Sequence, residues 1–484
     1  MISIKLNYKI LFVSILTIAL HSCSNPWDAH QNNGDANLSV SLGEVIPNSA
    51  KVSKFGQLIV QTGYDKILSE SKSYTVFAPT NEAMAQVDPA VFTTPETLYL
   101  FVANHIAITA YSSVRDQASV KIKMLSGKYL EFKGSSLIGD AAIVTPDLYA
   151  SNGIYHIVNK ALTPKLNIWQ YINSQKNSSL MSKYLVSLKE LNIYKADSIA
   201  KITAVPGALS DSLSNSYLRN VYNLNNEKNS YTLFLMDDTG YSAEVDKLAP
   251  YLIKSNADRT ATYSSYFTTR DLVFSKAYLP NQLPAVLTSR FGIDVPIDKT
   301  QIVGDPIILS NGIVYRVKRV DVPLANRLVT NKIEGENNNS FFPTNLRSKI
   351  FYRDKQDPLG INFKDIMVQN PTVSLFTLNY NNSGKDFFST TYKVYWRAIN
   401  DVQANVFQQK LSIGTGLNGI LTGTLKDFGY KDVPVNLYDE VYLGDVDITQ
   451  AGSLDFISLI AANNNTNGNN SLTLDYLKFV PVLK

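Results

Sequence analysis

The chain has 484 residues, 45% of them hydrophobic and 18% charged, which leaves room for about three globular domains and excludes a disordered protein. The formal net charge is +4 and no stripe rich in Lys and Arg occurs, so nucleic acid is not expected as a partner. A single Cys excludes a fold that depends on disulfides, so burial of apolar side chains must stabilise the domains.

Residues 1–22 have the pattern of a signal peptide. Lys5 and Lys9 precede an apolar run over 10–20 that is too short to span a bilayer. The run ends in Leu20-His-Ser-Cys23, which resembles the lipobox of bacterial lipoproteins. The resemblance implies that Cys23 is lipidated and anchors the mature chain in the outer membrane of the cell envelope. We expect exposure at the cell surface, although the sequence leaves a periplasmic orientation open.

The segment 23–37 follows the lipidation site. It is polar and carries no apolar period, which is typical of a flexible tether. A tether of this kind would hold the first domain away from the membrane. We therefore expect folded structure to begin near residue 38.

An internal repeat organises the next part of the chain. The segment 73–80, Ser-Tyr-Thr-Val-Phe-Ala-Pro-Thr, recurs at 230–237, and the segment 151–162, which begins Ser-Asn-Gly-Ile, recurs at 310–321. The two segments lie about 79 residues apart in the first copy and about 81 in the second. A duplicated domain explains this spacing.

Each repeated segment also predicts local structure. The first is a β-rich run that ends at Pro79, after which Thr80 or Asn81 can cap a helix that begins at Glu82. The second carries Asn-Gly between apolar runs, a dipeptide that accepts positive φ at both central positions of a tight turn. We therefore predict a hairpin near the end of each copy.

The same segments resemble the two signatures of the fasciclin domain. The intervening Phe101-Val-Ala-Asn-His105 lies where that family carries a central Tyr-His pair, so the resemblance covers 38–164. The copy over 165–324 is more divergent: it has Leu235-Met-Asp-Asp-Thr where the family has Ala-Pro-Thr-Asn, and no residue could be assigned to the central His. The resemblance implies two α+β domains, each a β-wedge packed with helices, that serve adhesion or matrix contact without catalysis.

The last third, 331–484, has a different pattern. A polar segment over 334–340 is interpreted as a linker, and short strand-like runs follow it with turn clusters between them. These runs cover 373–378, 392–399, 441–443, 454–459 and 472–479. Their spacing predicts an antiparallel β-sandwich, and their order resembles the closing half of carbohydrate-binding jelly rolls.

Trp396 is a candidate for stacking on sugar rings in this sandwich. Strand alternation places Val394, Trp396 and Ala398 on one side, and Lys393, Tyr395 and Arg397 on the other. The apolar side is expected to form the core, which favours a structural role for Trp396.

Candidate catalytic and metal sites are few. Of the four His residues, only His105 and His156 lie in folded regions, and their spacing does not suit a metal pair. His156 aligns with Tyr315, which predicts a half-buried polar tip in both copies. His105 is favoured as a buried, hydrogen-bonded side chain, and it remains the one candidate for binding a ligand.

Other motifs carry no chemistry in their context. The segment 414–419 matches a dinucleotide fingerprint, but no helix follows it, so a glycine-rich loop between strands is expected. The paired acids Asp237-Asp238 and Asp439-Glu440 are expected at turns. No catalytic residue, metal or cofactor is predicted.

Three functions therefore remain. The first is a cell-surface lipoprotein that uses fasciclin domains for adhesion or binds an extracellular protein or glycan. The second is an accessory glycan-binding lipoprotein of an outer-membrane polysaccharide-uptake system, with the sandwich as the binding module. The third is an enzyme such as a glycoside hydrolase, which would need two essential carboxylates on facing strands.

Overall fold

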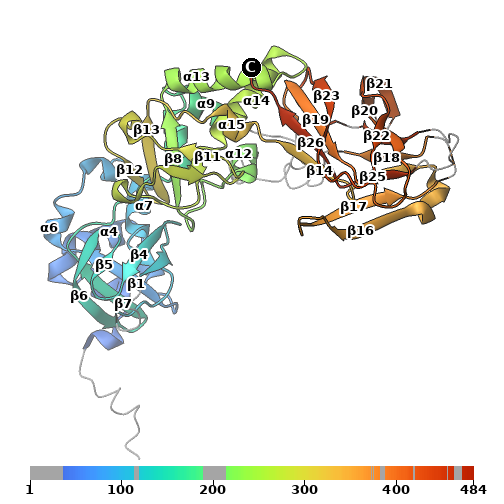
Figure 1. Ribbon diagram of the computed structural model, residues 1–484. Coiled ribbons are helices and arrows are strands. Elements are labelled where there is room, and N and C mark those ends of the chain that lie inside the picture. Colours follow the sequence, from blue (N-terminus) through green and yellow to red (C-terminus); the bar gives the residue numbers. More distant parts are fainter. Residues whose placement is uncertain are drawn as a thin grey trace, which may run out of the picture. The chain divides into compact units, whose positions relative to one another are not determined.

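The computed structural model describes residues 36–113, 119–188, 214–371, 373, 375–381, 387–417, 420–454, 456–462 and 471–484. The chain divides into two compact units, 1–166 and 167–484 (Figure 1). The predicted signal peptide, Cys23 and most of the predicted tether lie outside the described residues. Among the described helices, none is both long enough and apolar enough to cross a bilayer.

The first unit is built on one seven-stranded sheet. Its order is β2-β1-β7-β6-β5-β4-β3, with β1 and β7 parallel and the other neighbouring strands antiparallel. The central strands β1 and β7 are almost wholly buried, as expected for parallel strands covered on both faces. The strands are β1 (Tyr74–Pro79), β2 (Ile106–Ala107), β3 (Val120–Lys123), β4 (Tyr129–Lys133), β5 (Leu137–Ile138), β6 (Ala141–Ala150) and β7 (Gly153–Val158).

Short helices pack on this sheet. As predicted, β1 ends at Pro79, and the Thr80 hydroxyl caps the next helix by accepting a hydrogen bond from Ala83 N (3.1 Å). Pro95 begins another of these helices behind a capping box formed by Thr94 and Thr97. The α-helices are α3 (Leu42–Val45), α4 (Ser53–Gln61), α5 (Tyr64–Ile67), α6 (Asn81–Met84) and α7 (Pro95–Ala103), with 3-10 turns η1 (Ala36–Ser39), η2 (Ala50–Val52) and η3 (Pro89–Phe92).

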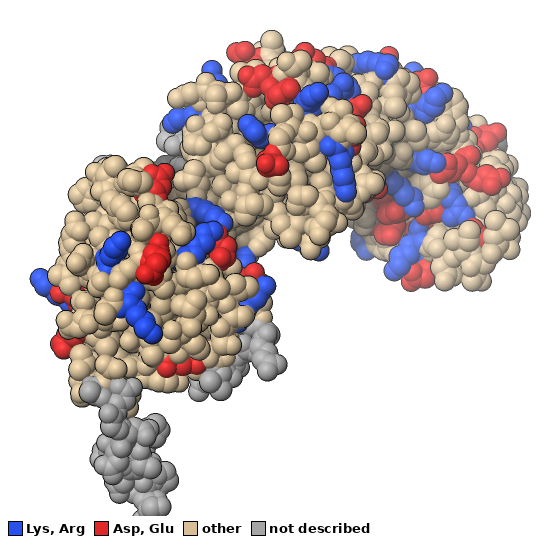
Figure 2. Space-filling model, turned by 90° about the vertical axis from the view of Figure 1, so that its left-hand side faces the viewer, with Lys and Arg blue, Asp and Glu red and all other residues tan. Residues whose placement is uncertain are grey.

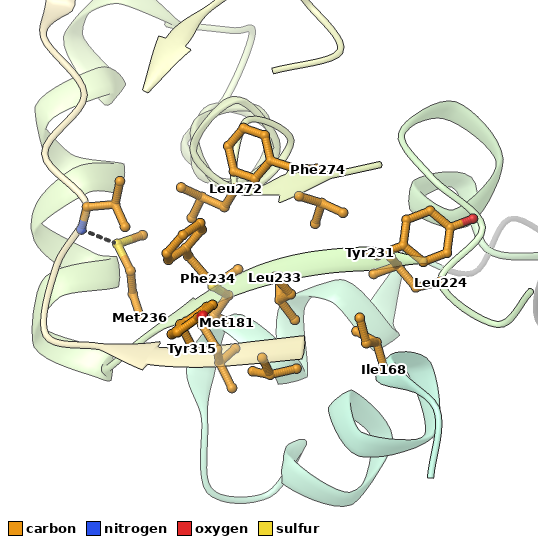
Figure 3. Packing of buried hydrophobic residues seen from close by; sticks show 14 of the residues in the cluster. Ile168, Met181, Leu224, Tyr231, Leu233, Phe234, Met236, Leu272, Phe274 and Tyr315 are labelled. Atoms are coloured by element: carbon orange, nitrogen blue, oxygen red, sulfur yellow. Dashed lines mark hydrogen bonds between the residues drawn. The ribbon is translucent and has the colours of Figure 1, made fainter. Parts of the chain in front are cut away.

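The second unit begins with a related α/β domain. Its four-stranded sheet has the order β12-β13-β8-β9, and β8 and β13 are parallel. Figure 3 shows part of its hydrophobic cluster, to which the sheet contributes Phe234, Phe274 and Tyr315 and the helices contribute Ile168 and Met181. The strands are β8 (Tyr231–Met236), β9 (Val273–Phe274), β10 (Val286–Thr288), β11 (Asp294–Pro296), β12 (Ile307–Leu309) and β13 (Gly312–Val317). The α-helices are α8 (Ile168–Gln175), α9 (Leu180–Ser187), α12 (Ser216–Asn220), α13 (Asp238–Leu248), α14 (Ala257–Thr269) and α15 (Leu324–Arg327), with 3-10 turns η5 (Ala249–Tyr251), η6 (Pro280–Gln282) and η7 (Lys299–Gln301).

The two α/β domains share the same strand register. Tyr74 pairs with Gly153 in the first and Tyr231 with Gly312 in the second, and each of these pairs begins a parallel ladder of six residue pairs. The second residue of β1 and of β8 makes the same hydrogen bond: Thr75 accepts from Tyr111 N (2.7 Å), and Thr232 accepts from Tyr278 N (2.9 Å). The internal repeat is therefore a repeat of three-dimensional structure.

The predicted hairpins are present, but of the positive φ angles expected at both residues of each Asn-Gly pair, the structure has the one at Gly312 (φ 151°). Asn152, Asn311 and Gly153 all have negative φ. Gly is needed because an added Cβ would lie 2.2 Å from Tyr74 O at position 153 and 2.0 Å from Tyr231 O at position 312. Each Asn side chain accepts a hydrogen bond from the first amide of α3 or α8 (2.9 Å in both) and donates to two carbonyl oxygens before β1 or β8. The Asn thus fixes the helix that opens each domain.

The last part of the chain is a β-sandwich of antiparallel sheets around one core. The sheets have the orders β14-β26-β19-β23, β15-β18-β24-β20-β21 with β22 on β20, and β16-β17-β25. Trp396 is 1% exposed and packs in this core, as strand alternation predicted. The interpretation of 334–340 as a linker was wrong, because its ends belong to β14 and β15, which pair with β26 and β18.

The strands of the sandwich are β14 (Asn331–Glu334), β15 (Ser340–Phe342), β16 (Ile350–Gln356), β17 (Asn362–Val368), β18 (Thr377–Tyr380), β19 (Thr391–Arg397), β20 (Phe407–Leu417), β21 (Ile420–Asp427), β22 (Lys431–Val433), β23 (Val441–Asp447), β24 (Phe456–Ala461), β25 (Leu472–Leu474) and β26 (Tyr476–Pro481), with one 3-10 segment, η8 (Thr344–Lys349).

Candidate ligand-binding groove

A hollow of about 580 Å³ opens on the sandwich where β14, β17, β19 and β26 meet. We call it the groove. Its lining combines aromatic rings with charged side chains of both signs. The lining residues are Lys332, Glu334, Glu336, Asp357, Ile361, Asn362, Phe363, Lys364, Arg397, Asp475 and Tyr476.

Arg397 is the central cation of the groove. Its guanidinium forms ion pairs with Asp357 (3.1 Å) and Asp475, and its Nε donates to Tyr438 O (2.7 Å). The ring of Phe363 lies 4.6 Å from the guanidinium carbon. Burial raises the pKa of the Asp475 carboxyl, although the hydrogen bond from Arg397 acts in the opposite direction. These contacts fix the guanidinium plane and the Phe363 ring in one orientation.

An outward face of tyrosines and lysines continues from the groove. Cross-strand pairing places Arg397 beside Tyr476, and Tyr395 beside both Lys478 and Tyr442, so these side chains share one face of the sheet. The rings of Tyr395 and Tyr442 lie 5.3 Å apart, and Tyr442 is 46% exposed. This tyrosine face offers flat, partly apolar surfaces next to the groove.

A second hollow of about 200 Å³ shares Glu336 and Lys364 with the groove. Arg353 lies there between two aspartates. It forms an ion pair with the buried Asp365, and its Nη1 donates to Asp401 (2.9 Å). Burial raises the pKa of the Asp365 carboxyl. The two hollows therefore flank Glu336, and each has an arginine held by two aspartates.

The structure places the predicted site residue His105 inside the first unit, with no exposed surface. Its Nδ1 donates to Phe101 O (2.8 Å) and its Nε2 accepts from Leu162 N (2.8 Å). Burial lowers the pKa of His105 to about 4, so the ring is neutral at physiological pH. Both nitrogens are occupied, and neither is accessible to a ligand.

His156 is also buried, where a half-buried tip had been expected. Its Nε2 donates to Tyr111 O (2.9 Å) and its Nδ1 accepts from Asp147 N (3.1 Å). Tyr315 has the equivalent role, since its hydroxyl donates to Tyr278 O (2.7 Å). Both positions are structural.

The other predicted features have structural roles as well. Gly414 lies in the antiparallel pair of β20 and β21, whereas 418–419 lie outside the described residues. Asp237 caps α13 by accepting from Gly240 N (2.7 Å), so it begins a helix and does not close a turn. Among the described residues, no three His, Cys, Asp or Glu side chains converge as a metal site requires.

Sequence reasoning missed the groove. Alternation had placed Tyr395 and Arg397 on the outward side of their strand, but the partners of Arg397 are 40 and 78 residues away in the chain. The pairing of β19 with β26 brings Asp475 to Arg397, and Asp357 comes from just after the end of β16 in another sheet. The alternation of Tyr395 and Arg397 on the outward side of the strand indicates an exposed polar face. It does not indicate which carboxylates bind Arg397.

On the face shown in Figure 2, atoms of Lys and Arg are interspersed with those of Asp and Glu, and no continuous stripe of one sign is visible. A nucleic-acid backbone would be matched by an extended positive surface. This face does not present one.

Comparison with known proteins identifies part of the chain. Residues 50–164 match the model of the Fasciclin domain. Transforming growth factor-beta-induced protein ig-h3 from Sus scrofa is 25% identical over 154 residues, which are 28% of this chain and 22% of that protein. Protein sll1483 from Synechocystis is 28% identical over 137 residues, 26% of this chain and 76% of that protein.

Two solved structures are also similar in part. A FAS1 domain pair from the insect cell adhesion molecule Fasciclin I covers 57% of this chain and 98% of its own, at 16% identity and a TM-score of 0.23. A family 11 carbohydrate-binding module from Clostridium thermocellum covers 32% of this chain and 90% of its own, at 14% identity and a TM-score of 0.20. The match to the Fasciclin domain, over 50–164, lies within the first unit of this chain.

Proposed function

We propose that the protein is a non-catalytic binding protein of the bacterial cell surface, in which the groove and the tyrosine face of the sandwich bind a glycan. The observation that carries this is the fixed arrangement of Phe363, Arg397 and Tyr476 around a hollow of about 580 Å³. Ring faces stack on the apolar sides of sugars, and planar charged groups bind their hydroxyls. The jelly-roll-like strand order of the sequence supports the same ligand class.

The pairing of charges in the groove supports a non-catalytic role. Asp357 and Asp475 are both bound by Arg397. A glycosidase needs one carboxylate free to donate a proton and a second free to attack or to activate water. Carboxylates held by one arginine do not supply that pair. Glu334 is paired with Lys332 (3.2 Å), which leaves Glu336 as the one carboxylate of the groove lining without such a partner among the described residues.

The first test measures glycan binding by the full mature chain. Affinity electrophoresis through gels that contain neutral or acidic polysaccharides should show retardation by at least one of them. Tyr476→Ala should weaken that binding about tenfold, the usual effect of losing a stacking platform. Tyr149→Ala, which removes a tyrosine that is 45% exposed in the first unit, is the matched control and should bind normally. Absence of retardation by every polysaccharide would contradict the proposal.

Adhesion through the fasciclin domain is a second candidate function. One helical surface of the first unit, formed by α4, η3 and α7, exposes Val60, Phe92, Tyr99 and Leu100 by 37% to 53%. Grouped apolar side chains on a surface favour a protein partner. Surfaces coated with the full chain should retain cells, and Tyr99→Ser with Leu100→Ser should reduce retention, whereas Leu483→Ser should not. Equal retention by all three proteins would exclude this surface.

The anchor and the orientation are part of the proposal. The lipobox-like Leu20–Cys23 and the preceding apolar run support a lipidated Cys23. The shared register of the two α/β domains supports a second, divergent fasciclin domain over 165–324. Protease added to intact cells should remove the chain, and Cys23→Ser should release it from the membrane fraction. Full protection from protease would contradict surface display.

A further inference from the structure

Glu336 differs from the other charged residues of the groove. It follows β14, where Gly335 N donates to Asp475 O (2.6 Å) and an added Cβ on Gly335 would lie 1.9 Å from Leu474 O. This close approach of two backbones sets the position of the next side chain. Glu336 consequently lines both the groove and the hollow beside it.

One carboxylate oxygen of Glu336, Oε2, is buried and accepts no hydrogen bond from any described residue. The neighbouring hydroxyl of Tyr380 donates elsewhere, to Gly335 O (3.0 Å). A buried oxygen without a donor is unfavourable because it has lost its water without gaining a partner, and more so when the group is charged. A donor from a bound molecule would remove that penalty.

The cations of the groove are already paired with carboxylates other than Glu336. Lys332 pairs with Glu334 (3.2 Å) and Lys364 with Asp354 (3.2 Å), while Arg397 binds two aspartates. In the adjoining hollow, Arg353 and Lys355 are bound by Asp365 and Asp401. Each of these cations therefore has a carboxylate partner.

The charged residues that line the groove include one more carboxylate than cations. The lining contains three cations, Lys332, Lys364 and Arg397, against four carboxylates, Glu334, Glu336, Asp357 and Asp475. A ligand carboxylate or sulfate would meet an unneutralised Glu336 in a partly desolvated place, and like charges there repel strongly. A ligand hydroxyl or ammonium group would meet an acceptor.

We propose that Glu336 is the specificity-determining residue of the groove: it accepts a hydrogen bond from a hydroxyl or ammonium group of the glycan and excludes glycans that carry carboxylates or sulfates. This inference rests on the proposed glycan binding and names the class of glycan. The groove therefore takes a glycan that is neutral or amine-bearing. Specificity arises here from a repulsive element as much as from an attractive one.

The experiment uses the full mature chain and two sets of probes. One set is neutral (β-glucan, xylan and mannan), and the other is acidic (polygalacturonate and alginate). Titration calorimetry with oligomers of equal length should give the wild type a preference of at least about tenfold for the best neutral oligomer over either acidic one. In Glu336→Gln, which keeps the shape and one acceptor but removes the charge, the preference should fall to within about threefold.

Asp432→Asn is the matched control. It removes one negative charge from the same sandwich, at the exposed strand β22 on the other sheet, and should keep the tenfold preference. Circular dichroism and an unchanged thermal unfolding midpoint establish that Glu336→Gln is folded. A wild type that binds acidic and neutral oligomers equally, or a Glu336→Gln variant that keeps the full preference, would overturn the role of Glu336 while glycan binding stands. A wild type that binds neither set would overturn glycan binding itself.

Discussion

The two α/β domains have the same scaffold and different polar chemistry at equivalent positions. In the first, the buried Asn104 accepts a hydrogen bond from Ser126 Oγ (2.6 Å); in the second, Asp271 accepts one from Ser289 Oγ (3.0 Å). The aspartate brings a charge where the asparagine has none. Arg327 neutralises it with an ion pair of 3.2 Å. A buried polar position thus tolerates a change of charge when the domain supplies a counter-ion.

The scaffold persists because backbone contacts define it. Phe77 N donates to His105 O (2.8 Å) in the first domain, and Phe234 N donates to Leu272 O (3.0 Å) in the second. His105 and Leu272 are therefore equivalent, although one ring links two backbone groups and the other side chain only packs. The central His of the first copy has no polar counterpart in the second.

The largest effect should come from the buried ion network of the second domain, which has no counterpart among the described residues of the first unit. Arg327 joins Glu244 and Asp271, and all three side chains are almost fully buried. Arg327→Met would leave two buried carboxylates with fewer partners, and we expect a loss of about 3 to 5 kcal/mol in that domain. Trp169, buried in α8, reports its unfolding by fluorescence, whereas the described part of the first unit contains no Trp.

Arg259→Met is the control for that change. Arg259 is an exposed arginine of α14 in the same domain and should shift the unfolding midpoint little. Hydrogen exchange in β1 and β7 of the first unit should remain unchanged by either variant. A loss below about 1 kcal/mol for Arg327→Met would show that the network is not what permits Asp271.

The next effect is a pH dependence confined to the first domain. The pKa of His105 is lowered to about 4 by burial, from about 6.5 in an unfolded chain. The neutral ring therefore stabilises the fold fully above about pH 6.5, and this contribution, about 3 kcal/mol, is lost as the pH falls through 4. His156, whose pKa burial also lowers, acts in the same direction.

Hydrogen exchange of the first unit between pH 7 and 4, corrected for intrinsic rates, measures this loss. The second unit contains no His and is the internal control. His105→Leu, which installs the residue of the second copy, should flatten most of the pH dependence even though it lowers stability at pH 7. An unchanged pH profile in that variant would assign the effect to other groups.

A smaller effect should be equal in the two domains. Asn152→Ala and Asn311→Ala each remove one acceptor and one amide that donates to two carbonyl oxygens. We expect each to lower the stability of its own domain by about 1 to 3 kcal/mol, with local exchange rising first in α3 or α8. If one variant lost stability and the other did not, the same hydrogen-bond geometry would contribute differently to the stability of the two domains.

These comparisons also show what the sequence could predict. The strand that ends at Pro79, the cap at Thr80 and the inward side of Trp396 follow from local chemistry and strand period, and each is present. The role of Asn152 was misjudged, because the dipeptide pattern predicts a turn conformation and not a side chain that reaches 110 residues along the chain.

The ion network and the groove depend on contacts of longer range. Glu244 and Arg327 are 83 residues apart, and Glu336 reaches the groove only through the pairing of β14 with β26. Neither separation leaves a periodic signal in the sequence. The polar run over 334–340 is therefore interpreted as a linker from the sequence alone, whereas Glu334 and Glu336 line the groove in the structure.

The smallest effect should come from exchanging His156 for the residue of the other copy. The His156 ring stacks on Phe77 with centroids 5.2 Å apart and 17° between planes, and Tyr315 stacks on Phe234 at 5.5 Å and 18°. His156→Tyr keeps the stack and a donor for the Tyr111 carbonyl but removes the acceptor for Asp147 N, so we expect a loss of about 1 kcal/mol at pH 7. His156→Ala removes the stack as well and should lose about 3 kcal/mol. Thermal unfolding of the two variants, monitored by hydrogen exchange in β7, measures both losses of stability. Equal losses would mean that Tyr cannot replace His156, and that positions 156 and 315 are equivalent in their backbone but not in their side chains.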